Sequence, residues 1–173
     1  MRVYIPSTLP DLSGKVRLDA VGRPDPRAVV ADAGSVGYAV TAGLREWYRD
    51  GDLEELEYVA LTRAARGSLR LIASSGLLAA ARRVVLAVDV SDADVVAAPQ
   101  IDVAAVRVRA VVLVEAVASV HVDDLAASAD VEAAARLVGA GEAGDDDARF
   151  VLDGLDDHEL QWYATQELGS LVG

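Results

Sequence analysis

The stretch from Asp52 to Ser74 restricts the possible folds more than any other part of the sequence, because it is long and has helical periodicity throughout. Its apolar and small residues recur three or four positions apart, which places them on one face of a helix. Asp52 and Glu55 have the spacing of a capping box, in which each carboxylate accepts a backbone N–H at the helix start. We therefore predict an amphipathic helix over 52–74. Its core-facing residues are Leu53, Leu56, Ala60, Leu61, Ala64, Ser68 and Leu71.

Short segments rich in valine lie before and after this helix and are typical of strands. Helical patterns fall irregularly between them, and such an order argues against a doubly wound parallel sheet. We predict a single α+β domain over residues 1–173, in which a short mixed or antiparallel sheet carries helices packed largely on one face. A ferredoxin-like arrangement is one topology that fits. The expected strands are 2–5, 28–31, 36–41, 83–90, 106–114 and 117–122, and the other expected helices are 41–50, 123–138 and 157–171.

Three segments rich in glycine, proline or aspartate are expected to be loops: residues 14–35, 91–104 and 139–155. The last of them includes the apolar sequence Phe150-Val151-Leu152. We expect these three side chains to anchor an otherwise mobile loop to the rest of the domain.

The composition excludes several classes of function. The chain has no cysteine, so it has no disulfide, no thiolate nucleophile and no cysteine-ligated zinc. Its net charge of −12 opposes binding to the phosphate backbone of a nucleic acid. No run approaches the roughly 20 apolar residues of a membrane span, and the opening MRVYIPSTLP lacks the pattern of a secretion signal. These features predict a cytoplasmic protein that binds neither nucleic acid nor membrane.

Two short sequences resemble nucleotide-binding motifs but lack the context that those motifs need. GAGEAG at 139–144 has the G-x-G-x-x-G spacing, yet it follows a helical pattern and leads into three aspartates that would repel a phosphate. SGKV around Lys15 lacks the first glycine of a P-loop and its magnesium-binding hydroxyl. We therefore expect no cofactor.

The sequence DDHELQWYATQEL at 156–168 is the densest cluster of polar and aromatic residues in the chain. Asp156 and Glu159 have capping-box spacing, which favours an amphipathic helix over 157–171. Alternatively, His158 and Glu159 could act as an acid–base pair. We favour the capped helix, because helix caps are much commoner than catalytic pairs and no nucleophile lies nearby in the sequence.

The sequence HVDD at 121–124 suggests a metal site as an alternative hypothesis. His121 and Asp123 would share one face of a strand. If the C-terminal segment folds back beside them, Asp157 and His158 would complete a site of two histidines and two carboxylates. No tight ligand spacing such as H-E-x-x-H is present, so we favour a strand that ends in helix-capping aspartates.

Arg63, Arg66 and Arg70 form a stripe along the predicted helix over 52–74. The arginine stripe could bind a phosphorylated metabolite or an acidic partner. Stripes of this kind are more often solvated helix faces, and we favour that interpretation. Anion binding stays open as an alternative.

Four segments of the chain resemble a family of uncharacterised actinobacterial proteins, a domain of unknown function. They are RVYIP at 2–6, LREWYRDGDLEELEYVAL at 44–61, VASVHVDD at 117–124 and DDHELQWYATQEL at 156–168. The excess of Ala, Val and Arg, typical of a GC-rich genome, agrees with this resemblance. The resemblance implies no activity, cofactor or site residue.

No catalytic motif stands out, so we expect a non-enzymatic protein that acts through a protein partner or as a homo-oligomer. Pairing of valine-rich strands across a sheet edge would be the means of association. Two alternatives remain: a binder of small anionic ligands that uses the arginine stripe, and a metal-assisted hydrolase. The hydrolase would use His121, Asp123, His158 and Glu159.

Overall fold

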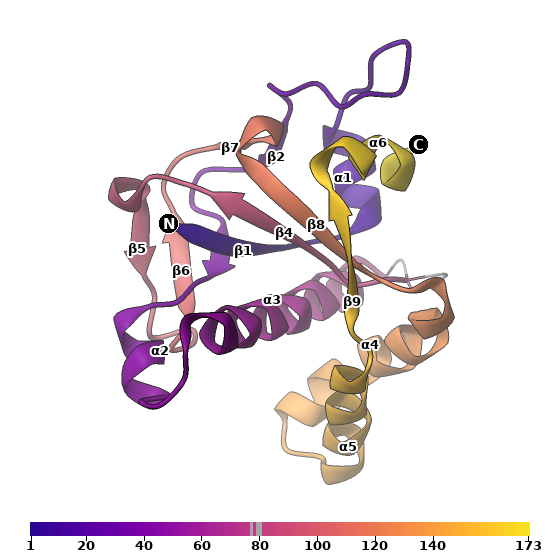
Figure 1. The fold of residues 1–173 in the computed structure, drawn as a ribbon. Coiled ribbons are helices and arrows are strands. Elements are labelled where there is room, and N and C mark those ends of the chain that lie inside the picture. Colours follow the sequence, from indigo (N-terminus) through magenta and orange to yellow (C-terminus); the bar gives the residue numbers. More distant parts are fainter. Residues whose placement is uncertain (77, 79–80) are drawn as a thin grey trace.

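The computed structural model describes residues 1–76, 78 and 81–173. The strands within these residues are β1 (Arg2–Ser7), β2 (Val29–Ala31), β3 (Val36–Tyr38), β4 (Val84–Asp89), β5 (Val95–Ala97), β6 (Ala105–Val108), β7 (Val112–Leu113), β8 (Val117–Asp123) and β9 (Leu160–Ala164). Seven of these described strands form one antiparallel sheet in the order β5-β6-β3-β1-β4-β8-β9, while β2 pairs with β7 (Figure 1). The protein is thus a single α+β domain with an antiparallel sheet, as predicted.

The described helices are α1 (Leu9–Lys15), α2 (Ala42–Trp47), α3 (Leu53–Ser75), α4 (Ser128–Glu142), α5 (Asp146–Gly154) and α6 (Leu168–Val172). The predicted capping box of α3 is confirmed. Asp52 Oδ1 accepts the N–H of Glu55 at 2.9 Å, and Glu55 Oε2 accepts the N–H of Asp52 at 3.1 Å. The helix ends at Gly76, whose φ of 70° lies in the left-handed region that glycine adopts without strain. No helix in the described residues is long and apolar enough to cross a membrane.

Helix α3 connects β3 to β4 and crosses the face of the sheet that also carries Tyr4 and Val85. Both strands pair antiparallel with β1, so they run parallel to each other on either side of it. A ferredoxin-like arrangement would need a second unit of this kind. Here the other helical connection, α4–α5, joins the neighbouring strands β8 and β9, so the topology differs from the ferredoxin-like one.

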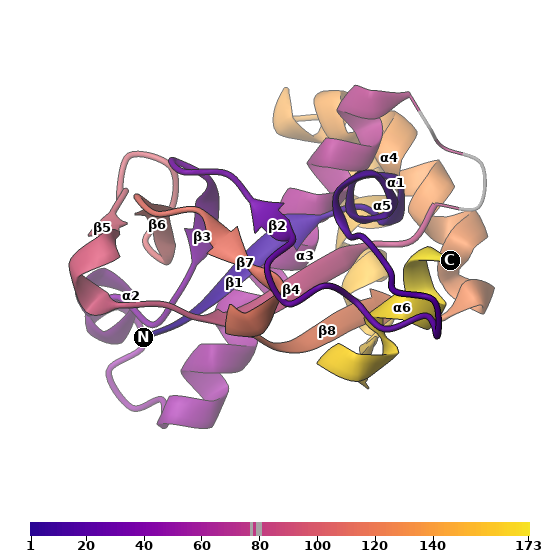
Figure 2. The same ribbon diagram turned by 90° about the horizontal axis from the view of Figure 1, so that it is seen from above.

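The sheet separates two apolar cores, because alternate residues of each strand point to opposite faces. On one face Tyr4, Val85 and Ala87 pack against α3. On the other, apolar side chains of β1 and β4 pack against α1, α6 and the β2–β7 pair, toward which Figure 2 looks. Helix α4 packs on the C-terminal half of α3. The long helices therefore lie on one face, as expected, and only short elements cover the other.

The prediction of a helix over 157–171 is wrong. Its central part is strand β9, which pairs with β8 from Asp123↔Leu160 to Ser119↔Ala164, and only its end is helical, as α6. Tryptophan and tyrosine have high strand propensity, and pairing with a distant strand outweighs apolar spacing that also suits a helix. The expected cap, Asp156, instead accepts a hydrogen bond from Arg66.

The prediction of a loop over 139–155 is also wrong, because α4 continues to Glu142 and α5 follows. Asp145 begins α5 by accepting the N–H of Ala148 at 2.8 Å. Gly141 allows the two helices to approach closely, since a Cβ there would lie 2.5 Å from Leu152 Cδ1. Phe150, an expected anchor, is 82% exposed, whereas Leu152 is half-buried. The other two expected loops, 14–35 and 91–104, consist mostly of loop and contain only short strands and helical turns.

Candidate functional site

The structure does not bring the four candidate metal ligands together. His121 lies opposite Trp162 in the β8–β9 pair. His158 lies before the start of β9, and its imidazole contacts Asp130 of α4, so it does not join His121 in one site. Asp157 is exposed in the turn before β9, and Asp123 is fully buried. No group of His, Cys, Asp or Glu residues that could hold a metal is present in the described part of the chain.

Both histidines already have polar partners. His121 Nε2 lies 3.1 Å from the hydroxyl of Ser119 on the same strand. Burial, followed by the positive charge of Arg2, lowers the pKa of His121 and favours its neutral form. His158 Nε2 lies 2.9 Å from a carboxylate oxygen of Asp130, at the start of α4. These contacts give each histidine a separate structural role.

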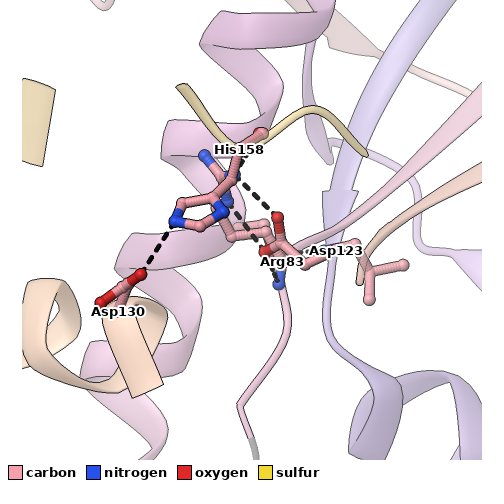
Figure 3. A network of polar contacts seen from close by, with 6 residues as sticks. Arg83, Asp123, Asp130 and His158 are labelled. Carbon is pink, nitrogen blue, oxygen red and sulfur yellow. Dashed lines mark hydrogen bonds and ion pairs between the residues drawn. The ribbon is translucent and has the colours of Figure 1, made fainter. Parts of the chain in front are cut away.

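Arg83 and Asp123 form a buried ion pair at the end of the sheet, where β4, β8 and β9 meet (Figure 3). Arg83 Nε and Nη2 donate to the two carboxylate oxygens at 2.9 and 2.7 Å, and the N–H of Arg83 donates to Oδ2 at 2.7 Å. Nη2 also donates to the carbonyl oxygen of His158 at 2.9 Å. The side chains are 2% and 0% exposed, so Asp123 is not available to a ligand, while Arg83 holds the residue His158 just before β9.

Each member of the arginine stripe contacts a carboxylate from another part of the fold. These pairs are half-exposed and join α3 to α4, to the segment around α5 and to the loop after β5. The stripe is therefore a surface whose positive charges are already balanced. The contacts are Arg63 Nη1 to Asp102 (2.6 Å), Arg66 Nη2 to Asp156 (2.6 Å) and Asp153 (2.9 Å), and Arg70 Nε to Glu142 (2.6 Å).

A cavity of about 260 Å³ lies between α3, α4 and α5, and Arg66 and Arg70 line it. Leu69 and Val138 contribute to its apolar wall. Asp156 Oδ1 is buried there and accepts no hydrogen bond from the described residues. Because Arg66 and Arg70 already contact carboxylates, the cavity lacks the uncompensated positive charge that would select an anion.

Strand β9 forms an open edge of the sheet, because it pairs with β8 and with no other described strand (Figure 1). The N–H of Asp123 donates to the carbonyl oxygen of Arg83, the residue before β4, and backbone groups alternate in direction along an antiparallel strand. Val120 and Val122 of β8 therefore bond to β9, through Tyr163 and Gln161. It follows that the backbone N–H and C=O groups of Leu160, Trp162 and Ala164 point away from the sheet.

The outward N–H of Ala164 is already satisfied, since it donates to Glu167 Oε2 at 2.8 Å. None of the described residues caps the outward groups of Leu160 or Trp162 in this way. Beside them the indole of Trp162 is 61% exposed, on the face of the sheet that α3 covers. The β9 edge, defined by Leu160 and Trp162, thus combines free backbone groups with a large aromatic side chain, a common anchor in protein interfaces.

Sequence reasoning found this segment but misjudged its form. The available signal was the sequence LQWYA, which has aromatic residues and strand propensity over the length of a short strand. The Arg83–Asp123 pair had no local signal, because its members are far apart in the sequence and meet only through strand pairing.

Comparisons with known proteins identify the family without an activity. No curated protein and no solved structure matches the chain. The model of a family of unknown function, DUF6912, matches residues 1–172, which include every strand and helix from β1 to α6. The resemblance to a domain of unknown function is confirmed: the chain belongs to DUF6912, a family of unknown function.

Proposed function

We propose that the protein is a non-enzymatic binding protein that associates with a polypeptide strand at the β9 edge. The observation that carries this proposal is the pair of outward, uncapped backbone positions at Leu160 and Trp162 beside an exposed indole. A strand added there would gain main-chain hydrogen bonds to Leu160 and Trp162 and an aromatic contact with the indole. We further propose that this association takes place in the cytoplasm.

The β9 edge supports this role better than the opposite edge, β5. Strand β5 pairs only with β6 among the described strands, but it is shorter and its side chains are two valines and one alanine. Interfaces draw much of their free energy from a few large side chains, most often Trp, Tyr or Arg. Only β9 offers such a side chain along its edge.

The two alternative functions have less support. A metal-assisted hydrolase needs His121 and His158 in one site, and the β8–β9 pairing keeps them apart. An anion binder that uses the arginine stripe would have to compete with the carboxylates that already contact its guanidinium groups. Neither geometry favours a ligand as directly as the open strand favours a partner.

The test compares Trp162→Ala with Trp47→Ala. Trp47 is a matched control, because it is 72% exposed but lies at the end of α2. Sedimentation velocity and pull-down from native lysate would measure association with itself and with partners. We expect Trp162→Ala to abolish the association and Trp47→Ala to preserve it. A strict monomer that retains no partner, or equal effects of the two substitutions, would contradict the proposal.

A further inference from the structure

Several exposed carboxylates lie close to the β9 edge in sequence or strand pairing, and no lysine or arginine among the described residues pairs with them. Asp157 and Glu159 are exposed, and neither contacts a lysine or arginine in the described part of the chain. Asp124 and Glu167 are exposed nearby and accept hydrogen bonds from uncharged groups. No lysine or arginine follows Arg149 in the sequence. Arg2, whose charge acts on His121 opposite Trp162, is paired with Asp89. The unpaired carboxylates therefore give the edge a negative potential, unlike the arginine stripe, where opposite charges are paired.

We propose that the strand accepted at the β9 edge is a basic, extended segment of another protein in which apolar residues alternate with arginine or lysine. This inference rests on the proposed function and names the chemistry of its partner. Charge complementarity supplies the argument, because a basic strand would neutralise carboxylates that are now unpaired. It would run antiparallel to β9, as the neighbouring strand β8 does.

The pairing pattern predicts which positions of the partner strand are apolar and which are basic. Partner residues opposite Leu160 and Trp162 exchange hydrogen bonds with them and point to the same face of the sheet. Apolar side chains suit these positions, because Leu160 is half-buried against the α3 core and the indole of Trp162 is exposed beside it. The intervening partner residues point to the other face of the sheet, which carries Gln161 and Tyr163. Basic side chains suit those positions, since they would approach Asp124, which accepts a hydrogen bond from Gln161, and the exposed Glu159 just before β9.

A second copy of this chain is a less favourable occupant. Each copy has a net charge of −12, and pairing of two β9 strands would add a second set of the same unpaired carboxylates to the region. Like charges that are brought together at an interface oppose association, and they do so most at low salt. A basic strand would instead be attracted by the same carboxylates.

The probe is an acetylated and amidated heptapeptide of alternating residues, Arg-Val-Arg-Val-Arg-Val-Arg, whose binding to the full chain is measured by isothermal titration calorimetry. Two control peptides of the same charge are N-methylated either at the valines or at the arginines. The valine N–H groups would face β9, whereas the arginine N–H groups would face away. We expect methylation at valine to weaken binding at least about tenfold, since several hydrogen bonds are lost, and methylation at arginine to change it by less than about threefold.

Protein variants and amide exchange complete the test. We expect Trp162→Ala and Glu159→Gln each to weaken binding of the peptide by about threefold or more, and Trp47→Ala to leave it unchanged. The amide hydrogens of Leu160 and Trp162 should gain exchange protection when the peptide binds. If the two methylations have equal effects, or if Trp162→Ala leaves the affinity for the peptide unchanged, binding is an unspecific attraction of charges. Either result would overturn the inference.

The outcomes also separate this inference from the proposed function. If the protein forms a dimer that depends on Trp162 and does not bind the peptide, the basic partner is wrong while association at the β9 edge stands. If the chain is a monomer that binds neither the peptide nor any partner, both are wrong.

Discussion

Arg83 and Arg66 make similar contacts in very different surroundings. Each donates to aspartate oxygens at 2.6 to 2.9 Å, and each joins elements that are distant in the sequence. The side chain of Arg83 is 2% exposed inside the sheet end, whereas that of Arg66 is 43% exposed on the surface of α3. The two regions therefore contain the same kind of ion pair, one exposed to water and the other buried.

Because the contact distances are alike, we expect burial to decide how much each ion pair contributes to the free energy of unfolding. Water competes for exposed charges, so that surface pairs typically contribute about 0–1 kcal/mol. A buried charge that loses its partner has no water to replace it, and removal of one partner typically costs about 3–5 kcal/mol. The arginine stripe should thus tolerate substitution, while the Arg83–Asp123 pair should not.

The largest expected effect is that of Asp123→Ala. This substitution leaves the Arg83 guanidinium buried without a carboxylate, so we expect the free energy of unfolding to fall by about 3–5 kcal/mol. Urea unfolding followed by circular dichroism measures it. The control is the double variant Arg83→Met/Asp123→Leu, which removes both charges and should recover most of the loss. A loss below about 1 kcal/mol for Asp123→Ala would show that the buried pair stabilises the fold no more than the exposed pairs of the arginine stripe do.

Ser68→Ala should have the next largest effect, because Ser68 is a buried polar contact between α3 and the sheet. Its hydroxyl donates to the carbonyl oxygen of Ser7 at 2.6 Å and accepts the N–H of Val84 at 2.9 Å. Loss of both bonds in a buried site should lower the free energy of unfolding by about 1–3 kcal/mol in a urea titration. Ser74→Ala removes an exposed serine of the same helix and should change little; equal losses for the two variants would contradict the argument.

The half-buried His121 should show an intermediate effect that depends on pH. Because burial lowers its pKa below the ordinary 6.5, the unfolded chain takes up the proton first as the pH falls. The protein should therefore lose stability below about pH 6.5, relative to the variant His121→Asn, and match its pH dependence above that value. Urea unfolding of both proteins at pH 7.5 and 5.5 measures the difference. A difference that is the same at both pH values would contradict the assigned shift.

Arg70→Ala should have the smallest effect. The contact of Arg70 with Glu142 is about half-exposed, so we expect a loss of at most about 1 kcal/mol, which decreases further at 1 M salt. Thermal unfolding at low and high salt measures both. A loss as large as that of Asp123→Ala would mean that the surface pairs hold α4 against α3 far more strongly than exposed charges usually do.

The sequence alone determined the elements that have strong local signals. The capping box and helical spacing gave the correct bounds of α3, although Leu53 and Leu71, two of its expected core-facing residues, are exposed. The helix expected over 41–50 is α2, where Thr41 accepts the N–H of Leu44 at 3.0 Å. The valine-rich segments of β4 and β8 also form strands where they were predicted. In each case the residues that decide the structure are neighbours along the chain, so their preferences can be read without knowledge of the rest.

Only the tertiary structure decided the C-terminal region and the candidate site. The segment 156–168 has apolar spacing that fits a helix and aromatic residues that fit a strand, and the choice depended on whether β8 was free to pair with it. The same pairing separates His121 from His158, buries Asp123 against Arg83 and exposes Trp162 at an edge. Non-local hydrogen bonds and burial determine these positions, and neither is visible in a local stretch of sequence.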